Sequence, residues 1–220
     1  MTTTPIADQA AVLAEGMADR TPSEALEAFG AEQAELDAAG VPSGIATAGS
    51  LMPDASLLDV HGNATTLQQV REGRPAVVVF YRGAWCPYCN LALRTYEREL
   101  APRLAERGVS MIAVSPQRPD GSLTMAQTND LSYDVLSDPG NHIGRALGIV
   151  TRPTDRVQHA QASLGLDLTE VNADGTRDIL MPTVAIVDAE GVLRWIDVHP
   201  NYVIRSEPAR ILEALARAVR

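Results

Sequence analysis

The amino-acid sequence predicts an α/β protein with three layers, in which a mixed sheet lies between two layers of helices. The continuous apolar runs 76–80 and 109–115 are typical of strands buried on both faces. A strongly helical segment beginning near Pro87 joins these runs, which predicts a right-handed βαβ unit. A predicted β-hairpin at 183–196 and a closing amphipathic helix at 206–220 complete the sheet and its cover.

An N-terminal extension, residues 1–47, is predicted to precede the main domain, residues 48–220. One helix is expected in it, because Pro22 suits a first helical turn and Glu24 favours the positive helix start. Gly40 is expected to end this helix. It is predicted to pack on the domain surface, and it is a candidate contact in a homodimer. Its sparse apolar stripe consists of Leu26, Phe29, Gln33 and Leu36.

Shorter elements fill the rest of the main domain. Pro102 is expected to kink or split the helix after residue 87, and Gly108 to close it. Residues 150–177 are predicted to be an irregular or helical insertion, with 157–164 as its most helical part. The remaining predictions are a short strand within 51–59, a helical turn at 66–70, a helix at 120–131, a strand at 133–137 and a helix at 141–147.

Composition and charge argue against several classes of protein, namely nucleic-acid-binding, membrane-bound and secreted proteins. The formal net charge of −10 disfavours nucleic acid and anionic membranes as partners. Residues 1–8 have neither a basic start nor an apolar run, so no signal peptide is predicted, and no stretch approaches the ~18 apolar residues of a membrane span. The expected location is the cytoplasm.

The two cysteines, Cys86 and Cys89, form a C-x-x-C pair where the strand 76–80 meets the following helix. A helix start favours a thiolate, and Pro87 fits the first helical position, where no N–H is needed. One sulfur of such a pair can attack an oxidised partner and the other can resolve the intermediate. Two buried structural cysteines are the alternative, which the flanking Trp85 disfavours.

No metal site and no cofactor are predicted. The chain has four histidines without H-x-x-x-H spacing, and it has no second C-x-x-C pair. The loop 199–202 follows the last predicted strand and is a candidate to approach the cysteines. A hydrogen-bonded loop histidine is the favoured interpretation of His199.

The segment Trp85-Cys86-Pro87-Tyr88-Cys89 resembles the active site of the thioredoxin superfamily, and Met181-Pro182-Thr183 resembles its cis-proline loop. Over residues 48–220 the pattern is similar to peroxiredoxins of the AhpC/TSA type, in their redoxin branch. The resemblance implies a thioredoxin-like fold with the N-terminal helical extension added to it. The motifs that carry this longer resemblance are Met52-Pro53-Asp54, Leu57-Leu58-Asp59, Gly62, Leu67, Phe80-Tyr81, Ser137-Asp138 and Gly148.

The chain departs from the peroxiredoxin pattern at its nucleophile. Peroxiredoxins carry P-x-x-x-T/S-x-x-C, which places Arg82 at the proline position, Cys86 at the threonine position and Cys89 at the attacking cysteine. The thioredoxin pattern instead makes Cys86 the attacking cysteine, so the order of attack stays open. The arginine that peroxiredoxins use at the late strand is replaced by Pro182. Arg82 is a candidate to supply that charge, with a surface or structural arginine as the alternative.

The resemblance implies a thiol peroxidase that reduces hydrogen peroxide or alkyl hydroperoxides. Cys86 and Cys89 would cycle between dithiol and disulfide, with Arg82 assisting and a thioredoxin-type reductant restoring the dithiol. The alternatives are a thiol–disulfide oxidoreductase acting on proteins and a non-enzymatic redox sensor. The expected substrate-contacting residues are Trp85, Pro87, Tyr88, Pro182 and Thr183.

Overall fold

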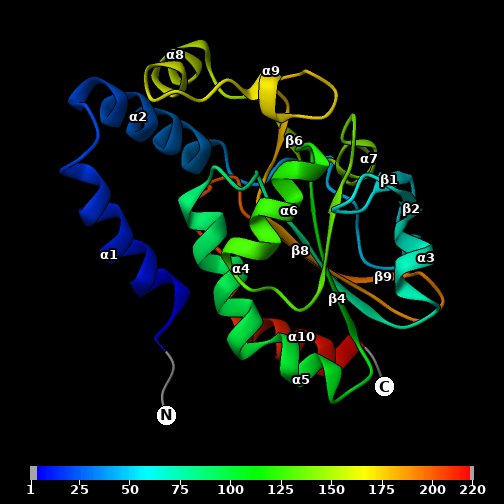
Figure 1. The fold of residues 1–220 in the computed structure, drawn as a ribbon. Helices are drawn as coiled ribbons and strands as arrows, with labels where there is room; N and C mark the ends of the chain where they lie inside the picture. Colours follow the sequence, from blue (N-terminus) through cyan, green and yellow to red (C-terminus); the bar gives the residue numbers. More distant parts are fainter. Residues whose placement is uncertain (1–3, 219–220) are drawn as a thin grey trace.

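The computed structural model describes residues 4–218, and its centre is a seven-stranded mixed sheet (Figure 1). The strand order is β2-β1-β5-β4-β3-β8-β9. β3 and β4 are parallel, as the predicted βαβ unit requires, and β8 runs antiparallel to β3. The strands are β1 (Ser56–Leu58), β2 (Ala64–Thr66), β3 (Ala76–Phe80), β4 (Ser110–Ser115), β5 (Asp134–Ser137), β8 (Thr183–Val187) and β9 (Leu193–Val198).

Helices cover both faces of this sheet, which confirms the three-layer thioredoxin-like architecture. Alternate side chains of β3 point to opposite faces, so that Val77 and Val79 join one core cluster while Val78 and Phe80 join the other. The first cluster packs against α1 (Ile6–Ala18), α4 (Pro87–Glu99), α5 (Ala101–Ala105), α6 (Pro119–Thr128) and α10 (Pro208–Ala218). The second packs against α3 (Leu67–Arg71) and α7 (His142–Leu147).

The N-terminal extension holds two helices, not one. The predicted helix is α2 (Ser23–Ala39), with Gly40 at its C-terminal cap, and α1 precedes it. The buried face of α2 also differs from the predicted stripe, because Ala25, Ala28 and Glu32 are buried while Leu26 is exposed. Small alanines face inward because α2 packs closely on α8 (Asp155–Ser163), beside which it lies in Figure 1.

The helix that follows the cysteines is split, as predicted. α4 ends at Glu99 and α5 begins at Ala101, because Pro102 lacks the N–H that would continue the ladder. Gly108 closes the pair with a φ of 65°, a conformation in which glycine has no Cβ penalty. This break lets α4 run back from the sheet edge that carries the cysteines.

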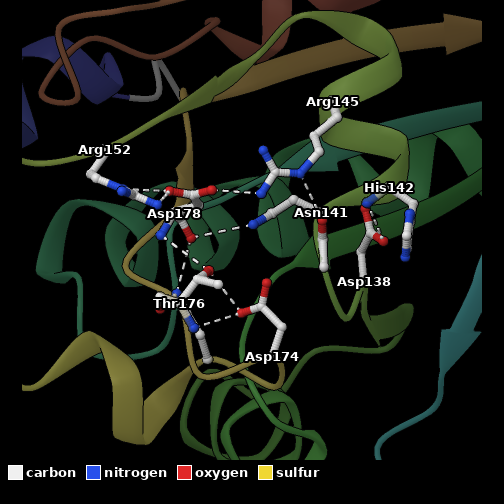
Figure 2. Close-up of polar contacts among 10 residues, drawn as sticks. Asp138, Asn141, His142, Arg145, Arg152, Asp174, Thr176 and Asp178 are labelled. Carbon is white, nitrogen blue, oxygen red and sulfur yellow. Dashed lines mark hydrogen bonds and ion pairs between the residues drawn. The ribbon is translucent and has the colours of Figure 1, made fainter.

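The insertion contains α8, α9 (Leu168–Val171) and a small second sheet of β6 (Val150–Thr151) and β7 (Ile179–Leu180). Asp178 ties it to the main domain (Figure 2). Its carboxylate accepts hydrogen bonds from Arg145 of α7 at 2.5 Å and from Arg152 at 2.7 Å. Its main-chain carbonyl accepts from the buried side chains of Asn141 and Asn172.

Within residues 4–218, no helix has both the length and the apolar character needed to cross a membrane.

Candidate functional site

The two cysteines lie where β3 passes into α4, at the strand-to-helix junction predicted from the sequence. Cys86 is the N-cap residue of α4, with extended backbone angles, and Pro87 occupies the first helical turn. Cys89 lies one turn further, and its N–H donates to the carbonyl of Cys86 at 3.0 Å. Both sulfurs are free thiols, and each cysteine is 1% exposed. The structure therefore brings two buried, reduced thiols together at a helix start.

Polar side chains from α4 and from the segment between β4 and α6 fix the loop that carries Cys86. Gln117 accepts a hydrogen bond from the Ala84 N–H at 2.8 Å and donates to the Tyr81 hydroxyl at 2.9 Å. Asn90 donates to the carbonyls of Ala84 and Cys86, at 2.7 and 3.0 Å. Because these bonds hold the loop at both ends, the first turn of α4 has a defined position.

Arg82 is a buried residue that contacts two aromatic rings. Its guanidinium lies 3.9 Å from the ring centre of Tyr202 and 5.1 Å from that of Trp85. Trp85 approaches so closely that a Cβ on Gly83 would meet its indole nitrogen at 2.3 Å. Arg82 is therefore neither a surface arginine nor, within residues 4–218, a member of a carboxylate ion pair.

The charge of the thiol pair resides on Cys89. Burial opposes it, but interaction with the Cys86 thiol, the Arg205 guanidinium and the Arg82 main-chain N–H together lower the pKa of Cys89. Nη2 of Arg205 lies 3.4 Å from the Cys89 sulfur. Burial and the neighbouring Cys89 thiolate raise the pKa of Cys86. The arrangement makes Cys89 the thiolate and Cys86 the thiol.

A narrow cavity lies against Cys89. Its volume of roughly 10 Å³ has room for about one water-sized molecule. Pro182 and Thr183 line it, as do Arg205 and His199. The structure thus places Pro182 and Thr183, predicted from a distant part of the chain, beside Cys89.

The prediction of a cis-proline at residue 182 is wrong, because no peptide bond within residues 4–218 is cis. Hydrogen bonds fix the trans chain instead. The Met181 N–H donates to the carbonyl of Ile149 at 2.8 Å, and the Pro182 carbonyl accepts from the His199 N–H at 2.9 Å. These bonds hold an extended segment that passes from β7 directly into β8.

The other predicted contact residues are divided between surface and core. Pro87 is exposed, Trp85 is half-buried and Tyr88 is buried. The ring of His199 contacts Asp197 at 3.2 Å and Ser206 at 3.3 Å, in agreement with a hydrogen-bonded loop histidine. Of the predicted contact residues at the start of α4, only Trp85 and Pro87 have side chains that a partner could touch.

Arg205 is the functional residue that the sequence did not reveal. It lies in the loop between β9 and α10, and two of its donor contacts go to the carbonyls of Tyr202 and Ile204. The sequence predicted that the loop 199–202 could approach the cysteines. No pattern in the sequence indicated that Arg205, three residues further on, would do so. Contact across 116 residues of sequence becomes visible only once β9 is paired with β8.

No cluster of three or more metal-ligating His, Cys, Asp or Glu side chains occurs in the described part of the chain. The groups gathered around the two thiols include Arg82, Arg205 and His199.

Comparison with known proteins places this geometry in a family. The family model described as Redoxin matches residues 47–214. Peroxiredoxin Q of Gentiana triflora is 31% identical over 101 residues, which cover 46% of this chain and 46% of the relative. The thiol–disulfide oxidoreductase ResA of Bacillus thuringiensis is 28% identical over 107 residues, covering 48% of this chain and 60% of that protein.

A structural comparison agrees on the fold. Reduced Prx3 of Vibrio vulnificus, solved with hydrogen peroxide, has a TM-score of 0.62 at 20% identity and covers 78% of this chain and 99% of its own. The chain spans 46–64% of the length of the curated relatives it matches. Because the family model covers most of the sequence, including both cysteines and Arg205, the chain belongs to the Redoxin family.

Proposed function

We propose that this protein is a thiol peroxidase that reduces hydrogen peroxide or small alkyl hydroperoxides through Cys89 and Cys86. The observation that carries the proposal is the environment of Cys89. Its sulfur is a buried thiolate beside the Arg205 guanidinium, and it faces a cavity with room for about one water-sized molecule. A peroxide oxygen can meet the sulfur at this cavity, whereas a protein cannot reach the sulfur without local opening.

The first step is attack of the Cys89 thiolate on one peroxide oxygen. The S–O bond forms as the O–O bond breaks, and the departing oxygen takes a proton from solvent to leave as water or an alcohol. Arg205 and the Arg82 main-chain N–H stabilise the thiolate before attack and the negative charge that develops on oxygen. Cys89 then carries a sulfenic acid.

The second step forms the disulfide. The Cys86 sulfur attacks the sulfenic sulfur of Cys89, the S–S bond forms, and the hydroxyl group leaves as water with the proton of the Cys86 thiol. Two electrons have then passed from the thiol pair to the peroxide. A thioredoxin-type dithiol would return them, and it would need the first turn of α4 to open, because both sulfurs are buried.

The second candidate is a thiol–disulfide oxidoreductase that acts on proteins. The C-x-x-C pair at a helix start favours it, as does the similarity to ResA. In that case Cys86 would attack a protein disulfide, with Trp85 and Pro87 as contact surface. The burial of Cys86 favours the peroxidase, because a protein disulfide cannot reach this sulfur without local opening.

The two functions separate in a paired assay of hydrogen peroxide consumption and insulin-disulfide reduction. We expect the wild-type protein to consume peroxide with a thioredoxin system, Cys89→Ser to lose this activity, and Cys86→Ser to accumulate a sulfenic acid on Cys89 that dimedone traps. Absence of peroxide turnover with any dithiol reductant would contradict the proposal. Insulin reduction that is lost in Cys86→Ser would then support the second candidate.

A further inference from the structure

A second and larger pocket lies beside the thiol site. Its volume is about 200 Å³, and it is bounded by α2, the segment 151–154, the segment 179–182 and the loop that carries Tyr202. Neither cysteine lines it, whereas Arg82 does. Figure 1 shows α2 lying across this end of the molecule, so the N-terminal extension supplies one wall.

The guanidinium of Arg82 has no protein acceptor in this pocket. The residue is only 5% exposed, and its guanidinium carbon lies over the rings of Tyr202 and Trp85. Among residues 4–218 it makes no side-chain hydrogen bond and no ion pair. A guanidinium presents five N–H donors, and Arg82 borders the pocket, where an acceptor on a ligand can reach them. The pocket therefore contains a positive donor group that a ligand can satisfy.

The remaining walls restrict the kind of ligand. They are mostly apolar, with Leu36 from α2 and Leu180, Met181 and Pro182 from the opposite side. A mainly apolar pocket with a few polar groups is typical of a small-molecule site. The ligand that matches these walls has an apolar body of a few carbons.

Two acidic residues, Glu32 and Glu35, line the pocket, but neither strongly opposes the binding of an anion. One carboxyl oxygen of Glu32 accepts from the Thr154 N–H at 2.9 Å. Burial raises the pKa of Glu32, so this carboxyl holds a proton more readily than a surface glutamate. Glu35 is exposed to solvent, and Arg152 adds a second positive charge at the rim, although it is paired with Asp178.

We propose that this pocket binds a small organic monocarboxylate, with the carboxylate on the guanidinium of Arg82 and the apolar chain against Leu36, Leu180 and Met181. A carboxylate matches the fork of guanidinium donors, and a charge-assisted pair of this kind is among the stronger hydrogen bonds. Neither cysteine lines this pocket, although Pro182 borders both it and the cavity at Cys89, and the inference does not depend on the peroxidase function.

The test is isothermal titration calorimetry, in which sodium hexanoate is added to the reduced full-length protein. Hexan-1-ol and hexylamine, which have the same chain length, are titrated in the same way as matched probes. We expect hexanoate to bind at least tenfold more tightly than either matched probe. Arg82→Gln should weaken hexanoate at least tenfold, whereas Arg94→Gln, the same change at an exposed arginine, should leave it unaltered.

Leu36→Trp provides a second variant that leaves Arg82 in place and fills the pocket from the α2 side. We expect it to abolish hexanoate binding while the circular dichroism spectrum shows that the fold is kept. Equal binding of hexanoate and hexan-1-ol, tighter binding of hexylamine, or unchanged hexanoate affinity in Leu36→Trp would each overturn the proposal. Since no peroxide is present in the titration, failure here and failure of the peroxidase function are distinguishable.

Discussion

At the scale of single residues, the contact with Arg205 adds to the interaction with the Cys86 thiol in lowering the pKa of Cys89. Replacing Arg205 by methionine removes the cation 3.4 Å from the sulfur while keeping an apolar side chain of similar length. We expect the pKa of Cys89 to rise by roughly one unit or more, because an opposite charge at this range favours the ionised form. The pH dependence of iodoacetamide alkylation, followed by mass spectrometry of Cys89, measures the shift.

Two variants control this prediction. Arg94→Met makes the same change at an exposed position of α4 and should leave the alkylation profile unaltered. Arg205→Lys keeps the charge and should recover part of the shift, which distinguishes an electrostatic role from mere support of the loop at Tyr202 and Ile204. An unchanged profile in Arg205→Met would show that Arg205 does not stabilise the thiolate.

At the scale of elements, Asp178 joins the insertion to α7 through two arginines. Asp178→Asn removes the carboxylate that both Arg145 and Arg152 contact, and we expect it to lower the free energy of unfolding by about 1–3 kcal/mol. Urea denaturation measures the change. Glu72→Gln breaks an ion pair whose partners are 74% and 51% exposed, and it should alter stability by about 0–1 kcal/mol at most.

The same network predicts the direction of a pH effect. Burial opposes ionisation of Asp178, but hydrogen bonds from Arg145 and Arg152 lower its pKa in the folded protein. A carboxyl with a lowered folded pKa contributes stability above its unfolded pKa and loses it as the pH falls through the folded value. The stability difference between wild type and Asp178→Asn should therefore shrink on acidification, and a constant difference would contradict the assignment.

Much of the fold was predictable from the sequence because buried strands leave a clear pattern. The apolar runs at 76–80 and 109–115 are strands β3 and β4, and Pro102 marks the break between α4 and α5. By contrast, α1 has no side-chain N-cap and a rather uniform Ala-rich sequence, so nothing local indicates which of its faces is buried. β6 and β7 have two residues each, too few for a period to appear.

The candidate site was predictable where its residues are adjacent in sequence or, like Pro182 and Thr183, carry a family motif. Cys86, Cys89 and Arg82 share one loop and helix start, so motif and spacing identify them together. Arg205 lies beyond the last strand, and its approach depends on how β9 and α10 pack against α4. The residue type does not single it out either, because all 18 lysine or arginine positions of the chain are arginines.

At the scale of the whole molecule, the first helix is part of the main core. Ile6 is 1% exposed and belongs to the cluster that contains both cysteines, and its N–H donates to the Glu207 carboxylate at 2.9 Å. We expect Ile6→Ala to lower the free energy of unfolding by about 2–5 kcal/mol. Val12→Ala, on the same helix but 70% exposed, should cost far less, and equal losses in urea denaturation would contradict this role.

The burial of both sulfurs has a consequence for the order of events in the proposed cycle. In that proposed cycle the closed molecule would react with a small oxidant, whereas the oxidised molecule would have to open before a protein dithiol could reach Cys86, because both sulfurs are buried. The oxidant and the reductant therefore meet different conformations and do not compete for one surface. Such a cycle predicts substituted-enzyme (ping-pong) kinetics, in which the first product leaves before the second substrate binds. It also keeps its resting thiolate out of contact with the other disulfides of its surroundings.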